Sequence, residues 1–246
     1  MAKFSKGQWV RKGHQQGIVS GLRGHSVLVR WAGSQKGVEC GSKSLVPCPP
    51  PQALILEGAL EDLESTRSEE DLLRNWLGSK CIPVAYTRVL TLEDIAVVGR
   101  EVGKKRPTFV HISCHGDYDG SRPYIQLAPG RAAKNKKIYL DDGPTTECFK
   151  NAFKGLPLLF SACLLGKHES AMLTFQKAAE LTSVAAFTKE VDDHEAMLFE
   201  LLLYQGTISN GWTFKNAAEK ACKALSDIGI RGGQGHGQSF VRVFRG

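Results

Sequence analysis

The stretches Phe109-Val-His-Ile-Ser-Cys-His-Gly116 and Leu156-Pro-Leu-Leu-Phe-Ser-Ala-Cys163 decide the fold. Each is an apolar run that leads directly into a reactive side chain, His115 in the first and Cys163 in the second. A strand buried on both faces reads as a continuous apolar run, and in an open parallel sheet the chemistry collects just past the carboxyl ends of the strands. We therefore expect His115 and Cys163 to meet at one edge of a parallel sheet.

Strands and helices alternate along residues 51–246, and this alternation predicts the fold class. Apolar runs typical of strands occupy 53–56, 82–89, 109–113, 156–163 and 183–187, with a further edge strand at 240–244. Helices are expected between them, and the first two begin at Ser68 and Thr91, each with an aspartate three residues later. The prediction is an α/β domain whose mostly parallel sheet is flanked by helices and joined by right-handed crossovers.

Two short strands at 124–127 and 138–140 interrupt the alternation as a hairpin-like excursion. The loop that divides them is basic and carries Arg131, Lys134, Lys136 and Lys137. An exposed hairpin tip tolerates nicking, so this loop is the candidate site of proteolytic processing. A merely solubilising tip is the alternative interpretation.

Residues 7–47 alternate short β-type runs with glycine turns, which predicts a small antiparallel β-barrel. Pro49-Pro-Pro51 stiffens its exit, so we expect a module at 1–50 and the α/β domain at 51–246. Trp9 and Trp31 are candidates for an aromatic ligand site, although tryptophans on alternate strand positions more often belong to the core. The module resembles, in a generic way, the Tudor and chromo-barrel class through Gly17-Ile-Val19, Gly24-His-Ser-Val27 and Val29-Arg-Trp31.

Positive charge is concentrated at the N-terminal end. Residues 1–50 hold eight lysines and arginines against Glu39 alone, so they account for the whole formal net charge of +7. Such an excess attracts phosphate irrespective of sequence, which makes nucleic acid a candidate partner. An activating or other acidic protein partner and simple solubility are the alternatives.

Length and composition bound the remaining possibilities. A chain of 246 residues, 42% hydrophobic, can pack one large domain and a small module. No apolar h-region follows Met1 and no run approaches about eighteen apolar residues, so we expect a cytoplasmic protein without membrane contact. The 7 cysteines form no C-x-x-C pair, which predicts reduced thiols, no metal site and no cofactor.

Residues 53–246 resemble the caspase-like peptidases, and among them the CHAT group related to separase and the caspases. The His115-Gly116 and Ser161-Ala-Cys163 motifs carry this resemblance, together with Phe175-Gln-Lys-Ala-Ala179, Val184-Ala-Ala-Phe187, Val191-Asp-Asp193, Phe199 through Tyr204 and Ala217-Ala-Glu-Lys-Ala221. The separation, 163 minus 115, is 48 residues and is close to the roughly 50 of caspases. Thr188-Lys-Glu190 departs from the pattern, because CHAT sequences often carry tryptophan before the acidic turn.

The resemblance implies a cysteine endopeptidase with a His/Cys dyad. His115 would activate Cys163 and later protonate the leaving amine. The N–H groups of Gly116 and Cys163 would form the oxyanion hole. No third catalytic residue is assignable.

Substrate preference is a separate expectation. Caspases take aspartate before the scissile bond, whereas separase and many relatives place an acidic residue there to accept arginine or lysine. Acidic side chains that match such a pocket are also present in this chain, at Asp117, Glu190, Asp192 and Asp193. They favour a basic residue before the scissile bond of the substrate. Alternatively, Asp192 and Asp193 open a helix as its N-terminal cap, and Asp117 lies with Asp119 in a solvated loop.

Other reactive residues have simpler interpretations. Strand alternation turns Cys114 away from His115, so Cys114 is expected to be structural, and His111 should be a satisfied core histidine. Gly232 through Gly237 reads as a flexible connection. The alternatives to a peptidase are a catalytically inactive caspase-like scaffold and a protein whose main function is the basic barrel.

Overall fold

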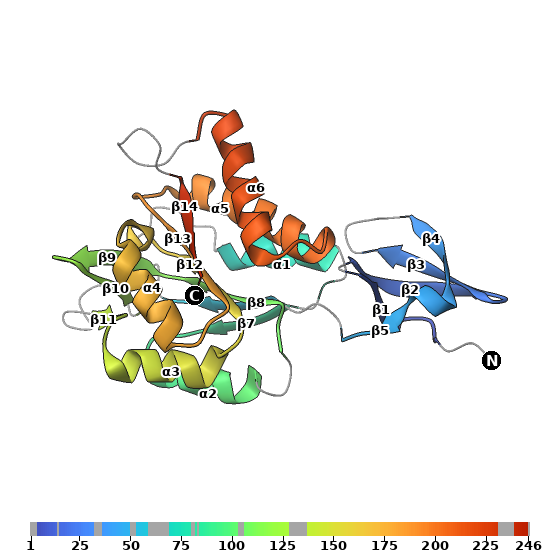
Figure 1. The fold of residues 1–246 in the computed structure, drawn as a ribbon, viewed down its shortest axis with the longest axis horizontal. Coiled ribbons are helices and arrows are strands. Elements are labelled where there is room, and N and C mark those ends of the chain that lie inside the picture. The colour runs from blue at the N-terminus through green and yellow to red at the C-terminus, as the bar shows by residue number, and fades with distance from the viewer. Residues whose placement is uncertain are drawn as a thin grey trace.

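The structure, a computed structural model, describes residues 4–13, 15–31, 36–49, 53–58, 69–79, 82, 84–102, 106–127, 137–230 and 239–245. Figure 1 shows a small sheet at the N-terminal end beside a larger part in which helices surround a central sheet. The basic residues at 131, 134 and 136 and the glycine-rich connection at 232–237 lie outside the described residues. No helix within the described ranges is long and apolar enough to cross a membrane.

The N-terminal β module (residues 4–49) is a five-stranded antiparallel sheet. Its strands are β1 (Trp9–Lys12), β2 (Gln15–Arg23), β3 (Ser26–Trp31), β4 (Gly37–Gly41) and β5 (Val46–Pro47), in the order β4-β3-β2-β1-β5. The module has a core of its own, built from Phe4, Val10, Val19, Val27, Val29, Cys40 and Leu45. Trp31 packs against that core, as expected for a tryptophan on a strand.

The central sheet has six strands and confirms the predicted α/β class. They are β6 (Ala53–Glu57), β7 (Val84–Arg88), β8 (Phe109–Ser113), β12 (Pro157–Ser161), β13 (Ser183–Phe187) and β14 (Val241–Phe244). The order is β14-β13-β12-β8-β6-β7, and every pairing is parallel except that of the edge strand β14. The two motif-bearing strands, β8 and β12, are therefore neighbours at the centre of the sheet.

Helices cover both faces of this sheet, which is why its strands read as continuous apolar runs. They are α1 (Glu69–Ser79), α2 (Leu92–Val102), α3 (Gly143–Phe153), α4 (Glu169–Ala178), α5 (Asp193–Tyr204) and α6 (Phe214–Asp227), with a π-helical turn η4 (Gln205–Ser209) after α5. Along β6, Leu54 and Leu56 enter the core shared with α2, α3 and α4, whereas Ala53 and Ile55 enter the core shared with α1, α5 and α6. Figure 1 shows these helices on opposite sides of the strands.

A second, three-stranded antiparallel sheet follows β8 directly. It consists of β9 (His115–Asp119), β10 (Arg122–Gln126) and β11 (Ile138–Tyr139), in the order β11-β10-β9. The turn between β9 and β10 has Gly120 at a positive φ of 63°, as the first turn residue of a type II′ hairpin requires. The interpretation of Asp117 and Asp119 as part of a solvated loop is therefore wrong, because both lie in strand β9.

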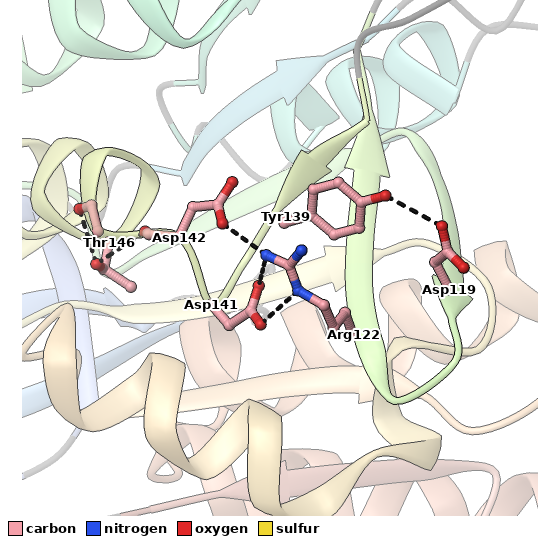
Figure 2. A network of polar contacts seen from close by, with 7 residues as sticks. Asp119, Arg122, Tyr139, Asp141, Asp142 and Thr146 are labelled. Carbon is pink, nitrogen blue, oxygen red and sulfur yellow. Dashed lines mark hydrogen bonds and ion pairs between the residues drawn. The ribbon is translucent and has the colours of Figure 1, made fainter.

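Polar contacts clamp this small sheet to the start of α3 (Figure 2). The Arg122 guanidinium donates to both oxygens of Asp141 at 2.8 and 2.9 Å and to Asp142 at 2.6 Å, and it lies 4.1 Å from the centre of the Tyr139 ring. Asp119 accepts hydrogen bonds from the Tyr139 hydroxyl and the Lys137 ammonium, both at 3.2 Å. Lys137, which directly precedes β11, is thus tied to strand β9 by an exposed ion pair.

Candidate active site

The two sequence motifs leave the central sheet side by side. Strands β8 and β12 pair in parallel with Ser113 opposite Ser161, and the Cys114 N–H donates to the Ser161 carbonyl at 3.1 Å. The residues that follow, His115 and Cys163, therefore start from adjacent strand ends at the carboxyl edge, where parallel sheets place their chemistry.

Gly116 packs directly against the turn that carries Cys163. A Cβ at position 116 would lie 2.8 Å from the Cys163 carbonyl oxygen, 2.8 Å from Ala162 Cβ and 3.0 Å from Leu165 Cγ. No side chain fits in that space, so this position requires glycine. The His-Gly motif and the Ser-Ala-Cys motif thus form one packed unit.

The Gly116 N–H points away from β10. The Pro123 carbonyl accepts a hydrogen bond from Leu140 on the other side of β10, so the pair Pro123 and Tyr118 exchanges no hydrogen bonds across β9 and β10. Bonded and non-bonded pairs alternate in an antiparallel ladder, which places Gly116, opposite Ile125, in a non-bonded pair as well. Neither Gly116 N–H nor Cys163 N–H has a hydrogen-bond acceptor within the described part of the chain.

The backbone directly after Cys163 is strained. Leu164 has a φ of 63°, in the left-handed region that L-residues with side chains seldom adopt. The Leu165 N–H closes a tight turn onto the Cys163 carbonyl at 2.7 Å, and a short 3₁₀ turn η3 (Leu165–Lys167) follows. Such strain persists only where the surroundings impose it, and it concentrates at functional sites.

The Cys163 sulfur lies against the backbone of Val191. The Val191 N–H donates to Sγ at 3.4 Å, and the thiol approaches the Val191 carbonyl at 3.8 Å. Burial raises the pKa of the Cys163 thiol; the bond from Val191 opposes this rise, and the carboxylates of Glu190, Asp193 and Asp117 add to it. Among the described residues, no hydrogen bond joins this sulfur to His115.

Of the four acidic residues expected at the pocket, two have polar partners among the described residues and two do not. Asp192 caps α5 by accepting the Glu195 N–H at 2.9 Å, as the capping interpretation anticipates. Asp117 accepts the Tyr124 hydroxyl at 3.2 Å and the Tyr118 N–H at 2.8 Å. The remaining two carboxylates, on Glu190 and Asp193, have neither a hydrogen bond nor an ion pair to any described residue.

Two residues near the motif are structural, as expected. Cys114 is 4% exposed and belongs to the core between the sheet and α2, α3 and α4. His111 is fully buried, with Nδ1 2.9 Å from the Tyr204 hydroxyl and Nε2 3.5 Å from a Glu200 oxygen. Within the described ranges, no three His, Cys, Asp or Glu side chains gather as metal ligands would.

Sequence reasoning did not anticipate three groups at the site. They are the Val191 backbone on the thiol, the left-handed Leu164 and the Tyr124 hydroxyl that holds Asp117. Residue type carries no signal for the first two, because they are backbone features of ordinary apolar residues. The hairpin register that sets Tyr124 opposite Asp117 was the one available clue.

Comparison with known proteins supports the fold. No family model and no curated protein matches the chain. Among solved structures it is similar to a secreted C11 cysteine protease from Bacteroides thetaiotaomicron in complex with an irreversible peptide inhibitor, with a TM-score of 0.50 and 10% sequence identity. The match covers 80% of this chain and 66% of that chain, just under two thirds of its length. At this identity the likeness shows the fold, and the caspase-like α/β arrangement expected from the sequence is confirmed.

Proposed function

We propose that the chain is a cysteine peptidase in which Cys163 is the nucleophile and His115 the base. The observation that carries the proposal is the close packing of Gly116 onto the Cys163 turn. A Cβ at position 116 would lie 2.8 Å from the carbonyl oxygen of Cys163. His115 and Cys163 follow the paired strands β8 and β12, and the solved structure with a similar fold is a cysteine protease, which supports the assignment. The strained Leu164 directly after Cys163 supports the same assignment, because backbone strain concentrates at functional sites.

The reaction follows from these groups. His115 takes the thiol proton as the sulfur of Cys163 attacks the peptide carbonyl, and the carbonyl oxygen becomes an oxyanion. The N–H groups of Gly116 and Cys163, which have no acceptor in the described structure, are the donors for that oxyanion. The histidine then protonates the leaving amine, and water hydrolyses the thioester to release the second product and the free thiol.

The proposed substrate is a protein cleaved after a basic residue. Glu190 and Asp193 lie close enough to Cys163 to act on its pKa, and their carboxylates are unpaired among the described residues. Asp117 adds a third negative charge, held in place by Tyr124. An arginine or lysine side chain would compensate these charges, whereas an aspartate would add to them.

A peptide-based electrophile with arginine next to the reactive group tests the proposal. We expect it to label Cys163 and to leave Cys114 unlabelled, because Cys114 is buried in the core. Peptide mass spectrometry locates the label, and Cys163→Ala and His115→Ala are the matched variants. Labelling of Cys114, or labelling that survives His115→Ala unchanged, would contradict the assigned roles.

The N-terminal β module supports a second, separate function in docking. Its exposed basic residues include Arg11, Lys12, Arg23 and Lys43, and the only acidic residue in 1–50 is Glu39. We propose that it binds a polyanion, either nucleic acid or an acidic protein that could activate the peptidase. A binding constant for an oligonucleotide that falls steeply with salt supports nucleic acid, and one without salt dependence excludes a phosphate-driven contact.

A further inference from the structure

Residues 189–193, called the strap below, cross over the proposed nucleophile. The Leu164 N–H donates to the Lys189 carbonyl at 3.1 Å, which sets the start of the strap beside the Cys163 turn. Val191 then contacts the sulfur through both of its backbone polar groups, at 3.4 and 3.8 Å. The thiol is therefore covered on the side of the strap, and a substrate carbonyl cannot approach the sulfur there while Val191 remains.

Polar contacts fasten the strap at its ends, whereas over the thiol its backbone makes only weak contacts to sulfur. The Lys189 ammonium pairs with Glu195 at 2.8 Å, and both side chains are about three-quarters or more buried, at 22% and 21% exposure. Asp192 caps α5 through Glu195, so the far end of the strap is continuous with that helix. At the middle, the Val191 side chain packs against the core shared with α1, α5 and α6, while its backbone contacts only the sulfur, a weak hydrogen-bonding partner.

Charge on the strap opposes ionisation of the thiol. Glu190 and Asp193 flank Val191 closely in sequence, and neither carboxylate has a partner among the described residues. Burial is the main cause that raises the pKa of the Cys163 thiol; both carboxylates, and Asp117 from strand β9, add to it, so the uncompensated acids favour the neutral thiol. A positive charge between Glu190 and Asp193 would remove that penalty and give the strap a new binding partner at the same time.

We propose that the strap is a switch that covers Cys163 at rest and is drawn off the sulfur when a cationic substrate side chain pairs with Glu190 and Asp193. The inference rests on the proposed peptidase function and adds the regulation of the same site. Recognition and activation are then one event, since the guanidinium or ammonium group that fits the site also exposes the nucleophile. A substrate without such a group leaves Val191 in place.

The test uses the full chain and needs no catalysis. The rate of iodoacetamide alkylation at Cys163 is followed by peptide mass spectrometry at constant pH, with argininamide or citrullinamide added. These two probes differ only in carrying a guanidinium or a neutral urea group. We expect argininamide to speed alkylation about fivefold, the effect of releasing contacts worth ~1 kcal/mol, and citrullinamide to have no effect. Cys48 in the β module is the internal reference thiol, whose rate should stay constant.

Variants test separately the Lys189–Glu195 ion pair that anchors the strap and the carboxylates of Glu190 and Asp193 that would bind the cation. Glu190→Gln combined with Asp193→Asn should abolish the argininamide effect. Lys189→Gln breaks the anchor to Glu195 and should speed alkylation without any added ligand. Lys215→Gln is the matched control, since it breaks an exposed pair with Glu219 on α6 and should change nothing.

The outcomes distinguish this inference from the proposed function. If argininamide leaves alkylation unchanged or slows it while the protein cleaves arginine peptides, the strap is not a switch and the peptidase assignment stands. If citrullinamide acts as strongly as argininamide, the coupling to positive charge is wrong. If argininamide speeds alkylation but no peptide is ever hydrolysed, the switch is supported and the peptidase assignment fails.

Discussion

Gly116 and Cys163 are separated by 47 positions in the sequence, 163 minus 116, yet a Cβ on Gly116 would lie 2.8 Å from the carbonyl oxygen of Cys163. This contact joins the start of the hairpin strand β9 to the turn after β12. It explains why the second residue of the His-Gly motif lacks a side chain, and it makes the geometry of the proposed oxyanion hole sensitive to one methyl group.

Gly116→Ala is expected to lower kcat/KM about 10²-fold, because the added methyl group displaces the Cys163 turn and misplaces the oxyanion donors. Steady-state hydrolysis of a fluorogenic arginine peptide measures the loss, and circular dichroism confirms that the variant folds. Gly78→Ala is the control: a Cβ there meets nothing within 4 Å on helix α1, so activity should not change. Full activity in Gly116→Ala would show that this contact has no catalytic role.

Cys163→Ala and His115→Ala should each lower kcat/KM for peptide hydrolysis by about 10³-fold or more. The double variant should lose no more activity than either single variant. The two side chains act as one unit, so their effects do not add. Cys114→Ala should stay active and lose only ~1 kcal/mol of folding free energy, as for a single truncated core group. Urea denaturation and the same peptide assay provide both readouts.

The alkylation rate of Cys163 should rise with pH to a midpoint above about 8.5, the ordinary pKa of a cysteine. Burial, followed by Glu190, Asp193 and Asp117, raises the pKa of this thiol in the folded state. The folded chain therefore holds the proton more tightly than the unfolded chain, so the free energy of unfolding falls as pH rises through that range. Glu190→Gln should lower the midpoint, and a wild-type midpoint at or below the ordinary cysteine value would contradict the shift.

Substrate preference should follow the free carboxylates. A fluorogenic library is expected to favour arginine or lysine before the scissile bond, and Asp193→Asn should raise KM for these peptides more than it lowers kcat. Asp192→Asn retains an efficient helix cap and serves as the comparison, because asparagine caps as well as aspartate. A library that prefers aspartate would exclude the basic-residue pocket.

Removal of residues 1–50 should spare hydrolysis of short peptides and weaken capture of a nucleic acid or protein partner. The β module has its own core, which is separate from the two cores on the faces of the central sheet. Kinetics on a short peptide and salt-dependent binding measure the two effects separately. A truncated chain that cannot fold would show that the predicted division near residue 51 is wrong.

Incubation at high concentration should nick the wild-type chain after Arg131, Lys134 or Lys136, and should leave Cys163→Ala intact. Lys137 should be spared, because its ammonium pairs with Asp119 and lies 4.5 Å from the centre of the Tyr124 ring. Intact-mass spectrometry gives the cleavage positions. An active chain that remains uncut would point to activation by a partner or by the substrate itself.

Much of the architecture was predictable because burial leaves a periodic signature. Runs such as 109–113 and 156–161 are apolar on both faces, and chain order with helical connections implies parallel neighbours, as β8 and β12 are. The capping motif at Thr91 and Asp94 likewise correctly marked the start of α2. Strand β9 escaped prediction because His-Gly-Asp-Tyr-Asp is a polar edge strand without apolar alternation, so nothing local distinguished it from a loop.

The sequence by itself determined the α/β class, the two motif-bearing strands and the placement of His115 and Cys163 at one edge. Only the tertiary structure decided that Val191 covers the thiol, that Asp192 is committed to a helix cap while Glu190 and Asp193 are not, and that Tyr124 holds Asp117. The physical reason is that periodicity reports which way a side chain faces. It does not report the path of a loop, and the contacts on the Cys163 sulfur come from the backbone of such a loop, which any residue type except proline would supply.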